Sequence, residues 1–188
     1  MNLPNKLTML RIFLIPFFVF FMLASFVPFH TYIALGIFIV ASLTDLLDGK
    51  IARKKNLVTN FGKFMDPLAD KLLVVSALLC LLIVDGGKRM CSNQMVALIA
   101  VIVIVAREFV ISGFRLVASD AGVVIAASMW GKFKTATTMV AICFMLVVLE
   151  LPFLTEVTLV LFWVAVTLTV VSLVDYIVKN KGVISDGK

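Results

Sequence analysis

The sequence is poor in the side chains that carry thiol and imidazole chemistry. Histidine occurs once, at His30, and the three cysteines, Cys80, Cys91 and Cys143, show no CxxC spacing. This scarcity argues against a zinc site built from cysteine and histidine and against a paired-thiol redox motif. The chain also has no internal repeat or low-complexity segment, so its 188 residues are expected to form one domain, residues 1–188.

Apolar residues are abundant. They make up 62% of the chain, with a mean hydropathy of +1.14, whereas soluble domains hold roughly 45–50%. We therefore expect an integral membrane protein. Runs of about 20 apolar residues, enough to cross about 30 Å of hydrocarbon, lie at residues 7–28, 31–50, 61–84, 94–118, 126–149 and 155–178. Because spanning helices satisfy every backbone polar group in lipid, the sequence predicts an all-α fold of six transmembrane helices with a short amphipathic N-terminal helix.

The distribution of basic residues predicts the orientation. An even number of spans puts both termini on one side, and of the 17 lysines and arginines only Lys88 and Arg89 then fall on the other side. The positive-inside rule places the basic side, with both termini, in the cytoplasm, as in a multi-pass protein of the cell membrane. The net charge of +6 has two explanations that stay open: this topology rule alone, or a role in holding anionic lipid.

Four aspartates lie where the second and third spans meet. Asp45 and Asp48 are three residues apart, and Asp66 and Asp70 are four apart, so each pair can share one helix face. Four carboxylates crowded together repel one another unless cations lie between them. Oxygen ligands without imidazole or thiolate suit hard ions. We expect these four residues to bind a divalent metal, Mg²⁺ or Mn²⁺. The site is expected to hold two ions.

Small residues and an arginine accompany the aspartates. Gly49 and Ala52 each lie about one turn after a motif aspartate, and Gly62 lies one turn before Asp66. A residue without a bulky side chain lets a ligand approach the backbone, and Arg53 offers a planar fork to phosphate. The alternative for the small residues is close helix packing. Their place beside four aspartates favours a ligand site.

Pro67 lies between Asp66 and Asp70. A proline removes one helix hydrogen bond, so the third helix either continues through it with a kink or begins at Pro67 with Asp66 as its cap. The four-residue rhythm of Gly62, Asp66 and Asp70 favours a continuous helix with a kink.

The pattern resembles that of a known family. Residues 45–70 match DxxDGxxAR, eight residues, then GxxxDxxxD, without a departure, as in the CDP-alcohol phosphotransferases. The resemblance implies the fold of that family and transfer of a group from a CDP-linked donor to an alcohol, with release of CMP. It also implies that the four aspartates bind the metal and that Asp70 is the catalytic base. CDP would then be held by Asp45, Gly49, Ala52, Arg53 and Gly62.

Two further segments resemble one branch of that family. PNKLTMLR near the start, and VAREFVISGFRLVAS followed by GVVIAASMWGKFKT later, are similar to phosphatidylglycerophosphate synthases. The resemblance implies CDP-diacylglycerol as donor and glycerol 3-phosphate as acceptor. Cations at the cytoplasmic ends of the fourth and fifth spans suit a phosphorylated acceptor: Arg107, Arg115, Lys132 and Lys134. Their alternative role is anchoring at the membrane surface. Glu108 is expected to pair with a neighbouring arginine rather than to act in catalysis.

The N-terminal segment adds candidates for CDP binding. Asn5, Thr8 and Arg11 recur every three residues after Pro4, so they can line one face of a short helix and cover the nucleotide. The alternative is that Lys6 and Arg11 only anchor the chain to anionic head groups.

Other functions remain as alternatives. The same family includes enzymes whose acceptor is inositol phosphate, serine or phosphatidylglycerol. A transporter is a more distant alternative, because it needs polar groups along a whole pathway and the outer halves of these spans are nearly without them. The resemblance also implies a homodimer. Membrane lipids are expected partners, and nucleic acid is not.

Overall fold

The computed structural model describes residues 3–55, 60–120, 128–149 and 151–180, and within these residues the secondary structure is helical. The elements are α1 (Leu3–Leu23), α2 (His30–Lys55), α3 (Asn60–Asp85), α4 (Gln94–Asp120), α5 (Met129–Val148), the 3₁₀ turn η1 (Pro152–Leu154) and α6 (Thr155–Lys179). The all-α prediction is confirmed for this part of the chain.

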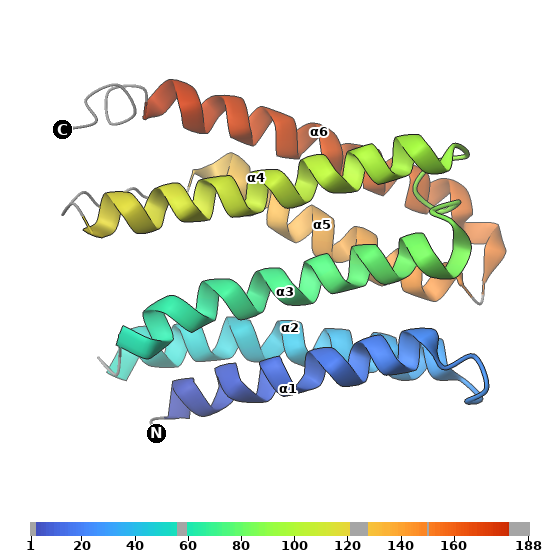
Figure 1. The fold of residues 1–188 in the computed structure, drawn as a ribbon, viewed down its shortest axis with the longest axis horizontal. Helices are drawn as coiled ribbons and strands as arrows, with labels where there is room; N and C mark the ends of the chain where they lie inside the picture. Colours follow the sequence, from blue (N-terminus) through green and yellow to red (C-terminus); the bar gives the residue numbers. More distant parts are fainter. Residues whose placement is uncertain (1–2, 56–59, 121–127, 150, 181–188) are drawn as a thin grey trace.

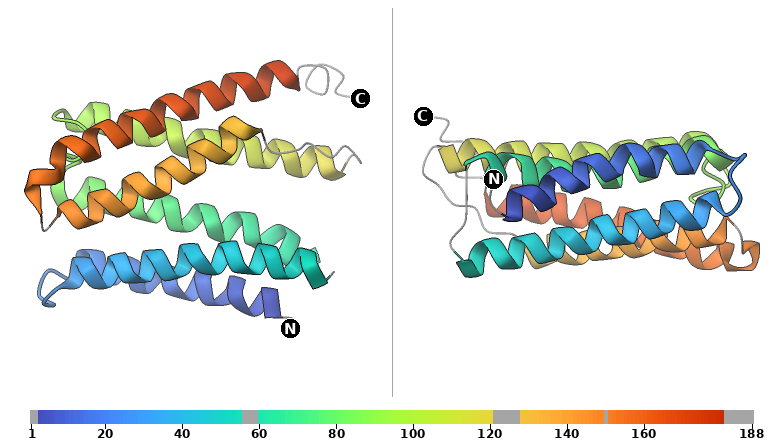
Figure 2. Two further views of the ribbon diagram at one scale, coloured as in Figure 1. Left: turned by 180° about the vertical axis from the view of Figure 1, so that it is seen from behind. Right: turned by 90° about the horizontal axis from the view of Figure 1, so that it is seen from below.

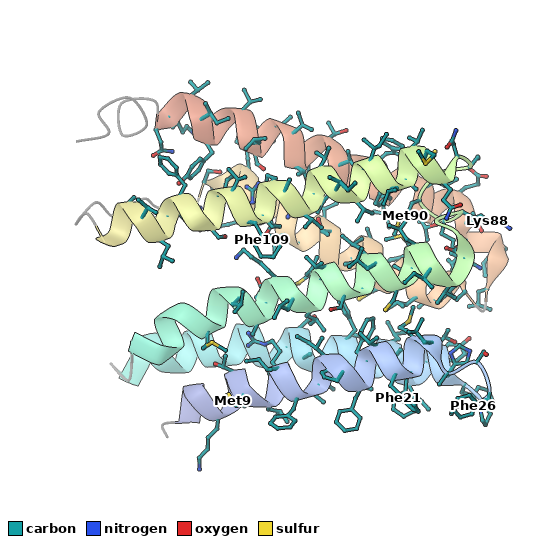
Figure 3. All side chains as sticks on the ribbon, viewed as in Figure 1. Met9, Phe21, Phe26, Lys88, Met90 and Phe109 are labelled. Atoms are coloured by element: carbon teal, nitrogen blue, oxygen red, sulfur yellow. The ribbon has the colours of Figure 1, made fainter. Side chains whose placement is uncertain are left out.

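The helices run alternately in opposite directions along one bundle. The turns after α1, α3 and α5 lie at one end, and both termini lie at the other (Figures 1 and 2). The end of α2 and the start of α3 are also at the terminal end (Figure 1). Lys88 and Met90 mark the opposite end (Figure 3). The segment that carries the aspartates therefore lies on the same side as the termini.

Close packing of small and large apolar residues forms the core. α1 packs on α2 and α3, α5 packs on α6 and α2, and α4 packs on α6 and α3. Alanines from four helices are buried at these contacts and let the backbones approach closely: Ala34, Ala41, Ala77, Ala97, Ala100 and Ala141. Phe18 and Phe38 fill the space between α1 and α2, with their ring centroids 5.9 Å apart. In lipid, burial of apolar surface contributes little free energy to helix association, so dispersion contacts of this kind hold the bundle together.

Four helices are long and apolar enough to cross a membrane when only the described residues are considered. They contain Lys6–Leu23, Gln94–Ala118, Met129–Val148 and Thr155–Lys179. The apolar part of α2, His30–Thr44, is shorter. The motif aspartates occupy the end of α2 and the start of α3, which shortens the apolar run in both. The chain is thus a membrane protein by length and composition, and six crossings remain a prediction.

The expected short N-terminal helix is wrong as a separate element. α1 is one uninterrupted helix from Leu3 to Leu23, with Pro16 inside it, because no turn residue separates the polar start from the apolar run. It ends before residue 28, the expected end of the first span. Phe29 takes a positive φ of 60° in the turn that follows, and His30 Nδ1 donates to the Phe21 carbonyl oxygen at 2.9 Å.

The third and fifth helices bear on two further expectations. α3 runs continuously from Asn60 through position 67, so the expectation of a continuous helix is confirmed. α5 begins at Met129 rather than at residue 126, because the Ser128 side chain accepts a hydrogen bond from the Gly131 amide at 3.1 Å and caps the helix there.

The turn between α3 and α4 joins several helices at the end of the bundle that is opposite the termini. Gly86 and Gly87 have φ of +66° and +73°, a region that favours glycine. Arg89 forms an ion pair with Asp85 and donates to the Val148 carbonyl oxygen at 3.2 Å. The Arg89 carbonyl in turn accepts from Thr158 at 3.3 Å. Four helices therefore meet at this turn.

Replacing Gly87 with alanine is expected to destabilise the bundle more than the same change at Gly86. Both substitutions place a Cβ at positive φ, which costs about 1 kcal/mol. At Gly87 the new Cβ would also lie 2.9 Å from Ala97 Cβ and 2.9 Å from Leu82 Cδ2, whereas at Gly86 its nearest neighbour is 3.9 Å away. Overpacking of this kind adds about 1–3 kcal/mol.

Thermal unfolding of the purified protein in detergent measures the difference. Gly36→Ala is the control for the substitution itself, since a Cβ there meets nothing within 4 Å. Equal losses of stability for Gly86→Ala and Gly87→Ala would contradict the packing argument.

Candidate functional site

The aspartate motif lies on two helices that meet at the terminal end of the bundle. Asp45 and Asp48 belong to α2, which continues to Lys55, while Asp66 and Asp70 belong to α3. The expectation that each pair lies on a helix is therefore confirmed, and α2 packs against α3. Only the Asp70 side chain of these four is described. Whether the four carboxylates converge on one point stays a prediction.

The other motif residues have the same status. Gly49, Ala52 and Arg53 lie in α2 and Gly62 lies in α3, as expected from their spacing. Their side-chain environments fall outside the described part of the structure. Among the side chains that are described, no group of three or more histidine, cysteine, aspartate or glutamate residues gathers in one place. The donor set itself, four carboxylates from two helices, fits a hard divalent cation.

Two N-terminal candidates share a buried face of α1. Thr8 and Arg11 are both fully buried, as the three-residue spacing predicts. Lys6 is exposed, and the Asn5 side chain is outside the described residues. A buried arginine in a membrane helix is costly and usually marks a site. This burial argues against surface anchoring as the only role of Arg11.

A cluster of three charges lies in the interior of the bundle, and we call Arg107, Glu108 and Lys134 the charge cluster. Arg107 Nη1 donates to Glu108 Oε1 at 2.8 Å, and Lys134 Nζ donates to the same oxygen at 2.6 Å. The side chains of Arg107, Glu108 and Lys134 are 8%, 13% and 2% exposed. Phe109, the next residue along, lies near the middle of α4 (Figure 3). One carboxylate oxygen thus holds two cations from different helices.

The charge cluster lies against the start of α5. A Cβ on Gly131 would lie 3.4 Å from Arg107 Nη2 and 3.5 Å from Ser128 Oγ, so glycine at this position lets the guanidinium approach the first turn. Arg107 Nε is buried and, among the residues that the structure describes, it has no hydrogen-bond partner. A buried donor without an acceptor is expensive, and this nitrogen keeps the capacity to donate a hydrogen bond.

Asp70 is the motif aspartate whose side chain the structure describes. It lies close enough to Lys134 for the carboxylate and the ammonium to attract each other. Asp70 is half-buried, and Ala69 next to it is fully buried. The structure therefore places the last aspartate of the motif beside a lysine that lies 64 residues later in the sequence.

The remaining acceptor candidates lie elsewhere. Arg115 is half-buried, and its Cζ lies 5.8 Å from the centre of the Tyr176 ring on α6, a cation–π contact. Lys132 is exposed, whereas Lys134 is buried, because residues two apart on a helix point in nearly opposite directions. The structure brings Arg107 and Lys134 together, and it brings neither Arg115 nor Lys132 into their hydrogen-bond network.

Three contacts at the site had no signal in the sequence. Tyr176 supports Arg115, Gly131 admits Arg107, and Glu108 reaches Lys134 as well as its neighbouring arginine. The expected pairing of Glu108 with an arginine is confirmed. Helical periodicity relates only residues of the same helix, so it does not predict contacts between α4 and α5 or α6.

Residues 1–171 match the family described as CDP-alcohol phosphatidyltransferase. A protein of Bacillus subtilis (strain 168), named CDP-diacylglycerol–glycerol-3-phosphate 3-phosphatidyltransferase, is 44% identical over 95% of this chain and 95% of its own length. Proteins with the same name from Haemophilus influenzae and Rickettsia felis are each 37% identical, over 98% and 93% of this chain and 96% and 93% of their own.

Proposed function

The chain belongs to the CDP-alcohol phosphatidyltransferase family, and we propose that it transfers the phosphatidyl group of CDP-diacylglycerol to glycerol 3-phosphate and releases CMP. Relatives that carry this activity in their names cover nearly the whole chain. One observation in the structure supports the acceptor in particular. Two buried cations meet in the charge cluster, and one of them, Lys134, also interacts electrostatically with Asp70, as a phosphorylated alcohol needs if its hydroxyl is to reach a base.

The proposed donor and acceptor are bound by two different groups of residues. The proposed donor residues lie on α1, α2 and α3: Asn5, Thr8, Arg11, Asp45, Gly49, Ala52, Arg53 and Gly62. The proposed acceptor residues lie on α4 and α5, with Arg107 and Lys134 binding the phosphate directly. Asp70 stands between the two groups. A donor with acyl chains in the bilayer and a nucleotide in water suits a site at the end of the helices.

Asp70 is proposed as the base. It accepts the proton of the acceptor hydroxyl while that oxygen forms a bond to the phosphorus carrying the diacylglycerol, and the bond from this phosphorus to the oxygen of CMP breaks. The Lys134 ammonium holds the acceptor phosphate near Asp70. Arg53 and the small residues of α2 hold the leaving nucleotide in place.

A divalent metal fits the carboxylate set and is proposed as the cofactor. Asp45, Asp48, Asp66 and Asp70 would hold it, with Mg²⁺ or Mn²⁺ as the ion and two ions per site. Bound there, the metal supplies positive charge against the pyrophosphate of the donor. A homodimer is proposed from the family resemblance alone.

The acceptor is tested with purified protein, CDP-diacylglycerol and a panel of alcohols, scored by release of CMP. Glycerol 3-phosphate should be used far better than glycerol, because glycerol leaves the buried cations without a partner. Arg107→Ala should raise the KM for glycerol 3-phosphate by the equivalent of about 2–5 kcal/mol and change the KM for the donor much less.

Two further variants sharpen this experiment. Arg107→Lys should restore part of the affinity, since a point charge reproduces only one of the contacts of a planar fork. Lys88→Ala removes an exposed cation at the opposite end of the bundle and should change neither KM. Equal turnover of glycerol, serine or inositol phosphate would refute the assignment of the acceptor.

Asp70→Asn is expected to lower turnover by about 10²–10⁴-fold, the usual contribution of a general base. The amide keeps the shape of the side chain but cannot take the proton. Binding of CDP-diacylglycerol, measured by calorimetry in detergent, should be largely retained. Retention of more than about a tenth of the wild-type turnover would exclude Asp70 as the base.

Removal of divalent metal is expected to abolish turnover. Four carboxylates near one pyrophosphate repel it unless cations intervene. CMP release is measured after exhaustive chelation and again after addition of Mg²⁺ or Mn²⁺, which should restore it. Undiminished turnover of the chelated enzyme would remove metal from the mechanism.

A further inference from the structure

Glu108 has an unusual position for a simple charge partner. It follows Arg107 directly in α4, and consecutive residues on a helix point about 100° apart. Their side chains nevertheless meet at 2.8 Å, and Lys134 from α5 reaches the same oxygen at 2.6 Å. Arg107 and Glu108 of α4 therefore both turn toward one point, and Lys134 of α5 approaches the same point.

The link between α4 and α5 at this level is made by long side chains. In the described part of the chain, α4 packs closely on α3 and α6, and α4 with α5 is not among the closely packed helix pairs. Glu108 Oε1 is the atom that both nitrogens contact. Without it, two buried cations would repel each other across this space, and their side chains would separate.

The charge cluster keeps binding capacity for an anion. A guanidinium has five N–H donors. Arg107 donates from Nη1 to Glu108, and its buried Nε has no partner in the described part of the chain. The capped start of α5 lies against the same guanidinium, and helix N-termini favour negative charge. The cluster has one more positive than negative charge. A phosphate group therefore meets unsatisfied donors, a net positive charge and a favourable helix end.

We propose that Glu108 is a positioning residue, which holds Arg107 and Lys134 together as a two-cation clamp for the acceptor phosphate on the side of Lys134 that faces Asp70. This inference rests on the proposed function, since the clamp is assigned to the phosphate of the acceptor. Glu108 itself touches neither substrate. Its effect reaches the substrate through the positions of the two cations.

Glu108→Gln tests the proposal by removing the charge that holds the cations while keeping the length of the side chain. The KM for glycerol 3-phosphate should rise at least about tenfold, and the KM for CDP-diacylglycerol should change less than about twofold. Glu108→Asp keeps the charge but shortens the reach, so it should give an intermediate KM. Inorganic phosphate, used as a competitive inhibitor, should lose affinity for the Gln variant in parallel.

Two controls separate positioning from stability. Asp85→Asn removes a carboxylate of similar exposure, 10% against 13%, that also pairs with an arginine, at the opposite end of the bundle. It should lower the thermal stability and leave the acceptor KM unchanged. The thermal stability of Glu108→Gln, measured beside its KM values, is the second control, because loss of positioning should raise the acceptor KM where a comparable loss of stability in Asp85→Asn does not.

The outcomes are distinct. If the wild-type enzyme does not use glycerol 3-phosphate, the proposed function fails before any variant is compared. If it does, and Glu108→Gln or Glu108→Asp keeps the wild-type acceptor KM, the positioning role alone is refuted. A fall in kcat that follows lost stability, with both KM values unchanged, would also refute it. A selective rise in the acceptor KM for Glu108→Gln, smaller for Glu108→Asp and absent from Asp85→Asn at a comparable loss of stability, supports it.

Discussion

The burial of two cations on one carboxylate oxygen is the constraint on which the polar interior of this bundle depends. Charges within the hydrocarbon region cost several kcal/mol by roughly the insertion-scale estimate unless they are paired. Arg107, Glu108 and Lys134 can therefore be buried together but not separately. This pairing links α4 to α5, and Lys134 also interacts electrostatically with Asp70 of α3. Three helices are thus linked by one set of charges.

Two parts of the bundle are held by different contacts. At the end away from the termini, Gly87 lies tightly against Ala97, and Arg89 joins the α3–α4 turn to α5 and α6 through backbone carbonyl and hydroxyl contacts. Near the middle of α4, the long charged side chains of the charge cluster join α4 to α5. The first set of contacts holds the helix ends together, and the second places charged groups in the interior of the bundle.

A division of the helices follows for the proposed reaction. α1, α2 and α3 carry the residues assigned to the donor, and α4 and α5 carry those assigned to the acceptor phosphate. Asp70 lies on α3 but faces Lys134 of α5, so it belongs to both groups. Proton transfer at that point would couple the two substrates. The long alkyl stems of lysine and arginine suit this task, because they carry charge across a gap between helices whose backbones are not closely packed.

The sequence by itself determined the class of fold, the helix pattern and the motif. Apolar run length predicted helices close to those found, and the spacing of Asp45, Asp48, Asp66 and Asp70 placed them on two helices, because both features depend only on residues near in the chain. The separate N-terminal helix was wrong, since α1 continues from Leu3 to Leu23 through Pro16. The tertiary structure alone decided that Lys134, and not the nearby Lys132, joins Arg107, and that Glu108 bridges them. Those contacts depend on the displacement and rotation of α4 against α5, which local periodicity does not encode.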